Sequence, residues 1–437
     1  MPEYFHSVTL DKEKCKGCTN CIKRCPTEAI RVRNGKAKII KERCIDCGEC
    51  IRVCPYHAKK AITDPFEDIF NYKYKIALPA PTLYGQFKNV WDINLILTGL
   101  KRIGFDDVFE VALAAEVVSD ASKQFIKSER VKKPVISSAC PAVVRLIRVR
   151  FPNLIENVMP VKSPMEVAAH MAKQIAEKTT GYSKNDIGVF FISPCAAKVT
   201  DSKNPVALDS SCIDGVISMK DIYLKLAAIL GKIDDVEELS CAGMSGICWA
   251  NSGGESAALE GEEDIAVDGI HNVIKVLEEL EDEKLSEVDF VELLSCTGGC
   301  VGGPLTVENS FVAKNRVAKI AKKTANQCLV KNVDKLYSID ISWNNPITYQ
   351  PIMKLDDNMA EAMKKMETIE SIYEKLPGLD CGSCGAPSCR SLAEDIVRGF
   401  ATETDCIFTL RDQVSMLAKE MIELEGKMPP PFRRNEE

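Results

Sequence analysis

The sequence predicts a multidomain α/β chain with a cysteine-rich module at each end. Its 437 residues allow two to four domains. Eight of the 20 cysteines lie in residues 15–54 and four more in 381–406, whereas the long middle segment alternates strand and helix signals. We therefore expect domains over 1–71, 72–350 and 351–410, followed by a helical tail with a disordered end over 411–437.

Composition narrows the class of protein. The hydrophobic share of 46% suits a folded chain, and the net charge of −7, without a basic block, argues against nucleic acid as a partner. The sequence has no run of 18 apolar residues and no apolar stretch typical of an export signal at its N-terminus. We expect a cytoplasmic protein with no membrane partner, whose clustered cysteines bind metals rather than form disulfides.

The N-terminal module contains two copies of the pattern C-x2-C-x2-C-x3-C-P, which is typical of bacterial ferredoxins. In this pattern the fourth cysteine of each copy ligates the cluster of the other copy. A zinc module is the alternative, but two tandem copies with both prolines favour two 4Fe–4S clusters that relay electrons. The expected ligands are Cys15, Cys18, Cys21 and Cys54 for one cluster, and Cys44, Cys47, Cys50 and Cys25 for the other.

In the middle segment, three apolar runs predict buried strands, and each leads into a loop with cysteine. The runs are Pro134–Ile136, Val189–Ile192 and Phe290–Leu294. Ligand sites in α/β folds lie at strand ends. One such loop alone would be an ordinary turn with an inert buried cysteine. Together the loops offer the four thiolates that one 4Fe–4S cluster needs, with a nearby lysine: Cys140, Cys195, Cys296, Cys300 and Lys198.

These three loops resemble the signature motifs of the iron-iron hydrogenase catalytic domain, and the resemblance covers roughly residues 1–350. It implies an H-cluster, in which the four cysteines hold a 4Fe–4S cluster and Cys300 bridges to a two-iron subsite with CO, cyanide and azadithiolate. Lys198 would hydrogen-bond one cyanide. Ala80, Pro81 and Thr82 resemble the segment that contacts the second cyanide and the dithiolate. The segment 252–255 resembles another family segment near the cluster.

The sequence departs from an efficient hydrogenase around the expected two-iron unit. Ala139 stands where efficient members have a cysteine that transfers protons. A thiol with a pKa near 8.5 exchanges protons near neutrality, whereas a methyl group cannot, and losing such a group typically costs ~10²–10⁴-fold in rate. Ser193 and Leu294 replace methionines, and Asp201 replaces a glutamate. The resemblance therefore implies that binding is kept and turnover is low, although a hydrogenase with a different proton path is an alternative.

The C-terminal module has the spacing C-x2-C-x4-C-x16-C, with a helix expected over Arg390–Thr404 and another over 353–375 before it. Four thiolates would also suit structural zinc. The module resembles the small 4Fe–4S domain of anaerobic electron-transfer proteins. Its attachment resembles the sensory, group D-like branch of the hydrogenase family, here without a PAS domain. The expected ligands are Cys381, Cys384, Cys389 and Cys406.

The tail places apolar residues at alternating steps of four and three, which is a short heptad seam. It could pair with a second copy as a homodimer, bind a partner, or fold onto its own domain. The seam consists of Leu410, Val414, Leu417, Met421 and Leu424. Four cysteines remain outside the expected ligand sets, and we interpret them as small buried residues or unused thiols: Cys212, Cys241, Cys248 and Cys328.

The resemblance implies a ferredoxin-type iron-iron hydrogenase (H2 = 2 H+ + 2 e−) of low activity that works as a hydrogen sensor under anaerobic conditions. It would bind H2 and CO, exchange protons, pass electrons to ferredoxin or another redox protein, and report to an unknown signalling partner. Hydrogenase maturation proteins would load it. Two alternatives stay open: a ferredoxin-linked hydrogenase with substantial turnover, and a non-catalytic hydrogenase-like protein with cubanes only.

Overall fold

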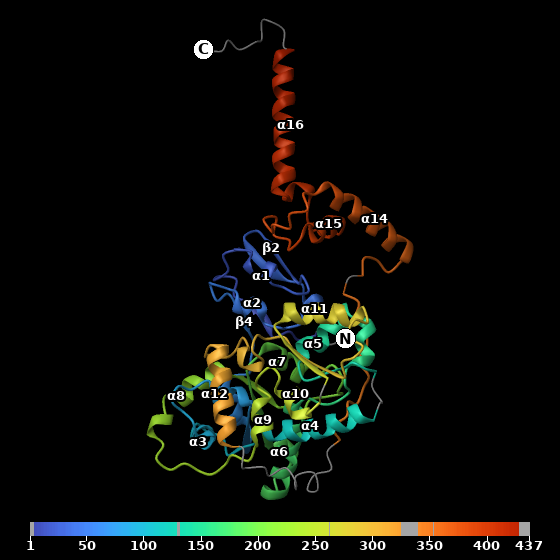
Figure 1. Cartoon of the computed structure of the whole chain (residues 1–437). Helices are drawn as coiled ribbons and strands as arrows, with labels where there is room; N and C mark the ends of the chain where they lie inside the picture. Colours follow the sequence, from blue (N-terminus) through green and yellow to red (C-terminus); the bar gives the residue numbers. More distant parts are fainter. Residues whose placement is uncertain (1–3, 129–131, 262, 325–339, 353, 428–437) are drawn as a thin grey trace. The chain divides into compact units, whose positions relative to one another are not determined.

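The computed structural model describes residues 4–128, 132–261, 263–324, 340–352 and 354–427 (Figure 1). The chain forms two compact units. The first comprises Met1–Thr9, Cys44–Arg52 and Lys59–Gln350, and the second comprises Leu10–Arg43, Val53–Ala58 and Pro351–Glu437. Among the described residues, no helix is both long and apolar enough to span a membrane.

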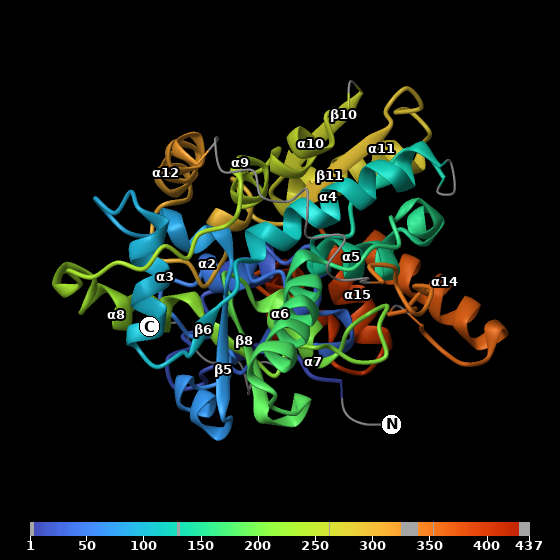
Figure 2. The same cartoon turned by 90° about the horizontal axis from the view of Figure 1, so that it is seen from below.

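The first unit contains a four-stranded parallel sheet in the order β6-β5-β8-β9. All seven residues of β8 are buried, as expected for a parallel strand covered on both faces. Figure 2 shows β5 and β8 side by side, with α6 nearby. The strands are β5 (Tyr74–Pro79), β6 (Asp107–Val108), β8 (Ile187–Ser193) and β9 (Gly215–Ser218).

A three-stranded parallel sheet, in the order β10-β11-β7, is the second sheet of this unit. Its strands are β7 (Val135–Ile136), β10 (Asp264–Asp268) and β11 (Phe290–Leu294). The three strands predicted from apolar runs are therefore present as β7, β8 and β11. In all three, the carboxyl end leads into a cysteine loop, which is the arrangement that positions the site.

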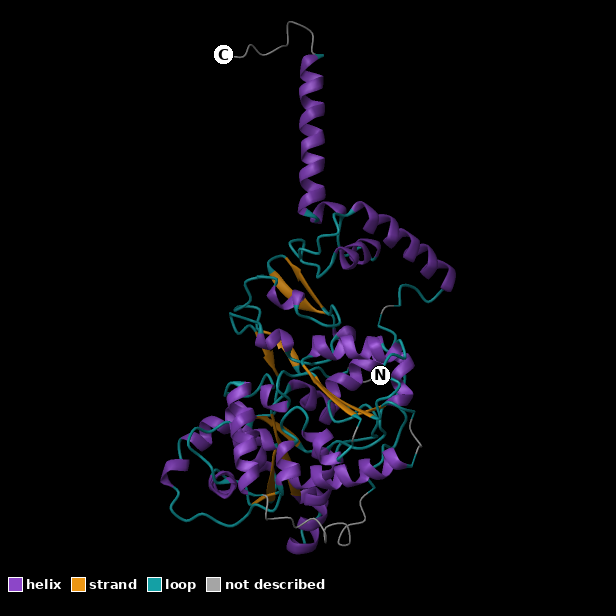
Figure 3. Ribbon diagram, viewed as in Figure 1, coloured by secondary structure: helices purple, strands orange, loops and turns teal. Residues whose placement is uncertain are grey.

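Helices surround these sheets, as the purple and orange ribbons of Figure 3 show. They are α2 (Glu49–Arg52), α3 (Ile93–Arg102), α4 (Val111–Lys127), α5 (Pro141–Arg150), α6 (Pro164–Thr180), α7 (Ala196–Lys203), α8 (Met219–Ala227), α9 (Met244–Cys248), α10 (Gly254–Leu259), α11 (Ile270–Glu281) and α12 (Ser310–Lys323). A further two-stranded sheet pairs β1 (Val8–Leu10) with β4 (Lys59–Ala61).

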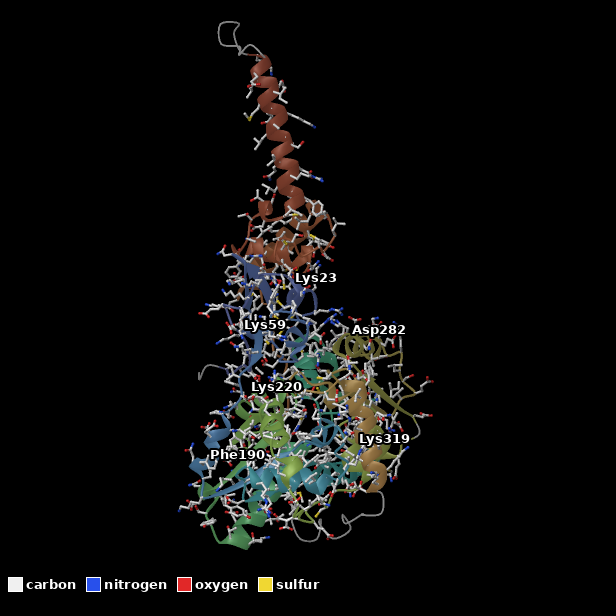
Figure 4. All side chains as sticks on the ribbon, turned by 90° about the vertical axis from the view of Figure 1, so that its left-hand side faces the viewer. Lys23, Lys59, Phe190, Lys220, Asp282 and Lys319 are labelled. Carbon is white, nitrogen blue, oxygen red and sulfur yellow. The ribbon has the colours of Figure 1, made fainter. Side chains whose placement is uncertain are left out.

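The core of the first unit is built from aliphatic and aromatic side chains of both sheets and their helices. Phe190 on β8, labelled in Figure 4, is buried and packs edge-on against Tyr72 at 5.6 Å between ring centroids. Such buried aromatic pairs add ~0.5–1.5 kcal/mol beyond area burial. This packing makes the strands that carry the cysteine loops a rigid base.

The second unit combines the first cysteine repeat with the C-terminal module. Its elements are α1 (Asn20–Lys23), the antiparallel pair β2 (Ile30–Arg33) and β3 (Lys36–Ile39), α14 (Met359–Lys375), α15 (Cys389–Val397) and α16 (Ile407–Gly426). Its C-terminal part has its own hydrophobic core, which includes Ile369, Leu392 and the thiols of Cys389 and Cys406.

Two predicted helices have different ends in the structure. The helix expected over 353–375 begins at Met359, because the Asn358 side chain accepts a hydrogen bond from the Ala360 amide at 2.9 Å and caps it there. The helix expected to reach Thr404 ends at Val397, since Gly399 adopts a left-handed conformation with φ +75° just beyond it.

The tail helix α16 has no buried residue among those the structure describes. The side chains of the expected heptad seam are all exposed: Leu410 is the least exposed at 44%, and Met421 is the most exposed at 66%. The interpretation that this helix folds onto its own domain is therefore wrong for the described part of the chain. Phe408 in its first turn packs against the core of the C-terminal module, but the apolar seam beyond it is exposed and available for a partner.

Candidate metal centre

Four thiols from the three strand ends come together in the first unit. Cys140 follows β7 and caps α5, Cys195 follows β8 and caps α7, and Cys296 and Cys300 lie in the loop after β11. Their sulfur atoms interact electrostatically: Cys140 with Cys296, Cys195 with both Cys296 and Cys300, and all but Cys296 with Lys198. The four thiols of the three loops therefore come together, as the sequence pattern predicted.

These thiols lie in a buried environment. Burial raises the pKa of Cys195 to about 12 and that of Cys300 to about 11, although the Lys198 ammonium acts in the opposite direction on both. Burial also raises the pKa of Cys140. One lysine cannot compensate four buried thiolates, whereas a bound metal cluster deprotonates its thiols outright. The donor set thus fits an iron–sulfur cluster.

Glycines let the third cysteine loop approach its neighbours. Gly299 has φ +100°, and a Cβ there would lie 2.4 Å from the Ser252 amide nitrogen. A Cβ on Gly303 would lie 2.2 Å from the Pro194 carbonyl oxygen. Because side chains at either position would collide with backbone, the loop requires glycine to close around the four thiols.

A cavity whose wall includes Cys300 lies beside the thiols. The Lys198 ammonium donates to the Ala139 carbonyl at 3.3 Å, and the buried Thr82 hydroxyl has no hydrogen-bond partner among the described residues. An unpartnered buried hydroxyl in a cavity wall fits a bound polar group. Of the predicted site residues, seven line the cavity: Ala80, Pro81, Thr82, Ala139, Lys198, Leu294 and Cys300.

Two predicted site residues, Ser193 and Asp201, are not among the residues that line this cavity. The Ser193 hydroxyl donates to the Cys195 carbonyl at 2.9 Å and accepts from the Cys195 amide at 3.2 Å, so it holds the loop. The Asp201 carboxylate lies 3.4 Å from the guanidinium of Arg145. Burial raises the pKa of Asp201, although Arg145 and Lys198 act to lower it. Both side chains support the loops from outside the cavity.

Two buried acids lie in the cavity wall: Glu255, which belongs to the segment expected near the cluster, and Glu292, which was not predicted. Burial and the nearby Glu292 raise the pKa of Glu255 to about 8, and burial also raises the pKa of Glu292. Ser137 donates to Glu255 at 2.5 Å and accepts from the Ala139 amide at 3.2 Å. The signal for Glu292 was visible, because it is the single acid inside the apolar run of β11.

Trp249 and Met165 also line the cavity and were missed. The Trp249 indole donates to the Ser119 hydroxyl at 2.9 Å, which fixes the ring. Met165 lies in the first turn of α6. Neither had a sequence signal, since a buried tryptophan or methionine on a helix usually belongs to the core.

The second cysteine repeat touches the third loop through Arg52. Its guanidinium donates to the Gly302 carbonyl at 2.8 Å and hydrogen-bonds the Cys296 sulfur. Burial opposes the charge, but Cys296 and Glu49 raise the pKa of Arg52 above its ordinary value. Gly48, with φ +74°, lies so close that a Cβ would be 2.5 Å from Pro304. The part of this repeat from Cys44 to Arg52 and the four thiols therefore belong to one compact unit.

The predicted ferredoxin ligands are divided between the units. Cys15, Cys18, Cys21 and Cys54 all lie in the second unit, whereas Cys44, Cys47 and Cys50 lie in the first and Cys25 in the second. Backbone amides donate to several of these sulfurs, such as Ala37 to Cys15 at 3.4 Å and Ala58 to Cys54 at 3.3 Å. The ligand assignments remain predictions.

The remaining cysteines have mixed environments. In the C-terminal module, Cys389 and Cys406 are buried, Cys384 is half-buried and Cys381 is exposed. Of the cysteines without an expected cluster, Cys212 and Cys248 are half-buried and Cys241 is exposed, so none of these three is a fully buried core residue. Cys328 lies outside the described residues.

Comparisons with known families match all three modules. A family model for the C-terminal domain of the iron-only hydrogenase large subunit matches residues 73–261 and 233–304. Models for a 4Fe-4S dicluster domain and for an Fe-S cluster match residues 7–55 and 376–408. The predicted fold class is confirmed: the N-terminal module is of the 4Fe–4S type, and the C-terminal module is an iron–sulfur module.

Individual relatives have low identity. The periplasmic [Fe] hydrogenase large subunit of Nitratidesulfovibrio vulgaris is 26% identical over 364 residues, covering 69% of this chain and 86% of its own. The cytosolic Fe-S cluster assembly factor NAR1 of Scheffersomyces stipitis is 26% identical over 142 residues, covering 31% and 26%. A single-residue variant of the [FeFe]-hydrogenase HydA1 from Chlamydomonas reinhardtii has a TM-score of 0.50 at 16% identity, covering 66% and 97%.

Proposed function

The chain belongs to the iron-only hydrogenase family, and from this premise we propose that it is a hydrogen sensor of the family's sensory, group D-like branch. It binds H2, and also CO, at a complete H-cluster: a 4Fe–4S cluster on Cys140, Cys195, Cys296 and Cys300, and a two-iron subsite with CO, cyanide and azadithiolate. It turns H2 over slowly and passes electrons through its accessory 4Fe–4S clusters.

One observation carries this proposal. The methyl group of Ala139 lies in the wall of a cavity that retains Lys198, Thr82 and Cys300. The cation and the hydroxyl suit the binding of an anionic, polar group, whereas the thiol that would pass protons is missing at the neighbouring position. A cavity that keeps the groups for binding but lacks the proton donor supports detection of H2 rather than its rapid turnover.

The chain's own residues have distinct tasks in this proposal. Lys198 supplies a hydrogen-bonding cation, and Pro81 with Ala80 and Leu294 keeps the cavity apolar and excludes water. The bound six-iron group would supply H2 binding and heterolytic cleavage. Glu255, with a pKa of about 8, can hold and release a proton near neutrality, and the Ser137 hydroxyl links it to the Ala139 backbone.

The partners follow from this chemistry and are proposals as well. H2, CO and protons reach the cavity, and ferredoxin or another one-electron redox protein exchanges electrons with the accessory clusters. Hydrogenase maturation proteins load the two-iron subsite, and an unknown signalling partner reads the redox state. We place this work in an anaerobic cytoplasm, because the cluster cysteines must stay reduced.

Infrared spectroscopy tests the proposal directly. After co-expression with the maturation enzymes, we expect bands from metal-bound CO and cyanide that shift when H2 is added. Methyl viologen-linked turnover should be ~10²-fold or more below that of a relative with a thiol at the Ala139 position. Turnover equal to such a relative would remove the sensor assignment and favour a ferredoxin-linked hydrogenase.

A second candidate function is a non-catalytic role with cubanes only. The 26% identity to a cluster assembly factor over 142 residues favours this alternative. It predicts that CO and cyanide bands are absent after maturation although the iron of the cubanes is present. The lysine and hydroxyl that line the cavity favour the sensor instead.

A further inference from the structure

The C-terminal module and the first cysteine repeat belong to one compact unit, in which hydrogen bonds join β2 to the loop of Cys384. The Val32 amide on β2 donates to the Gly385 carbonyl at 2.8 Å. The Arg33 guanidinium donates to the Cys384 carbonyl at 2.7 Å. The loop that carries Cys381 and Cys384 therefore lies along β2 as an additional strand would.

Glycines in this loop make the contact close. Gly385 has φ +80°, and a Cβ there would lie 1.9 Å from the Val32 carbonyl oxygen. Gly382 has φ +76°, and its Cβ would lie 2.9 Å from the side chain of Lys23, which Figure 4 labels. The two glycines flank Cys384, so the backbone around this expected ligand directly contacts the ferredoxin repeat.

Buried charges hold the two parts together. Arg31 and Arg33 both contact the Asp395 carboxylate, at 2.7 and 2.8 Å, and Arg43 pairs with Glu394. Arg31 and Asp395 are only 5% and 4% exposed. Charged side chains are buried to this extent almost only when they are paired. The contact is therefore a built interface within the unit.

A short path connects the two expected ligand sets. The Ala37 amide on β3 donates to the Cys15 sulfur at 3.4 Å, and Ala37 is the register partner of Val32. Val32 in turn donates to Gly385, the residue after Cys384. Adjacent strands lie about 4.8 Å apart, so two strand spacings and the 3.4 Å contact between Ala37 and Cys15 separate the two ligand loops, or about 13 Å in all.

We propose that the C-terminal cluster and the cluster on Cys15, Cys18, Cys21 and Cys54 are an adjacent one-electron redox pair. One electron leaves the reduced C-terminal cluster, which becomes oxidised, and enters the oxidised N-terminal cluster, which becomes reduced. No bond is made or broken and no proton moves. A one-electron redox protein supplies or removes the electron. The guanidinium of Arg33, beside Cys384, offsets repulsion between the anionic clusters.

This inference makes the C-terminal module part of the electron path rather than a structural element. It requires only that the cubanes are loaded, so it is independent of the two-iron subsite and of hydrogen. Absent CO and cyanide bands would therefore overturn the proposed function and leave the redox pair unaffected.

Electron paramagnetic resonance of the full chain, loaded with iron and sulfide and reduced with dithionite, tests the pair. Two reduced clusters this close should give a spectrum broadened by magnetic coupling. In Cys381→Ser/Cys406→Ser, which lacks the C-terminal cluster, we expect the remaining signal to lose the part of this broadening that the C-terminal cluster causes. The spectrum of the variant can be subtracted from that of the native chain. If the difference is the spectrum of a single uncoupled cluster, the proposal is overturned.

Two glycine variants distinguish the contact between the Cys384 loop and β2 from the loading of the clusters with iron. Gly385→Ala inserts a methyl group against β2 and should abolish the coupling while the iron content stays the same. Gly378→Ala is the matched control, because Gly378 lies near the same module with φ +65° and open space around it. Loss of coupling in both variants, or in neither at full iron content, would contradict the contact as the route.

Discussion

Ala139 is the residue on which the slow-turnover assignment depends. Replacing it by cysteine restores a group with a pKa near 8.5 beside the cavity. We expect Ala139→Cys to raise methyl viologen-linked H2 oxidation by at least ~10-fold, at the low end of what general acid–base groups contribute. Ala139→Ser is the control of similar size, whose hydroxyl does not titrate near neutrality. An equal increase in both variants would exclude the thiol's pKa as the reason.

Glu255 is the second residue with a predicted effect on rate. Because burial and Glu292 raise its pKa to about 8, it is protonated below that pH and accepts protons poorly there. H2 oxidation by the native chain should therefore rise as pH increases through 8, and H2 production should fall. Glu255→Gln should lower both rates by ~10²-fold and remove this pH dependence.

The control for Glu255 is Glu116→Gln. Glu116 is also buried, but it accepts from the Ser245 hydroxyl at 2.8 Å and the Gly246 amide at 3.2 Å and does not line the cavity. It should leave the pH profile unchanged. A pH profile that persists in Glu255→Gln would show that protons reach the cavity by another group.

At the scale of elements, the loop after β11 depends on glycine to close. A methyl group on Gly303 would meet the Pro194 carbonyl at 2.2 Å, so Gly303→Ala should push the loop away from Cys195. We expect loss of the four irons of this cubane while the terminal clusters remain, measured by iron content and paramagnetic resonance. Gly231→Ala, with nothing within 4 Å, should keep full iron content.

The elements show what the sequence could predict and why. Runs such as Phe290–Leu294 became strands because uninterrupted apolar residues require cover on both faces, and their loops carried recognisable ligands. Glu292 stood out in the same run as its single acid, but it was overlooked, since the strand prediction rests on the apolar residues around it. Ser193 was expected in the cavity, but its hydroxyl satisfies the Cys195 backbone instead. Which backbone groups a side chain bonds within a loop cannot be read from any periodic pattern in the sequence.

At the scale of the whole molecule, the tandem cysteine repeat does not stay together as one compact unit. The first repeat and Cys54 belong with the C-terminal module, whereas the rest of the second repeat, Cys44–Arg52, belongs with the four thiols of the strand-end loops. The repeat in the sequence gave no sign of this division, because ligand spacing is the same in both copies. The deciding features are long-range pairs such as Arg31 with Asp395 and Arg52 with Gly302, which lie hundreds of residues apart.

The exposed seam of α16 predicts how whole chains associate. Ile407 extends the seam by one residue. Ile407, Val414 and Met421 then occupy one of the two apolar heptad positions, and the three leucines occupy the other. β-Branched residues at the first position with leucine at the second favour two-stranded parallel coiled coils. Burying each such side chain contributes ~1.5–3 kcal/mol, whereas a lone helix of this length is marginal in water. We therefore expect a homodimer in sedimentation, and Leu417→Lys should convert it to a monomer. Met416→Lys, next to the seam and equally exposed, should remain dimeric; a monomeric native chain at micromolar concentration would show instead that α16 awaits a different partner.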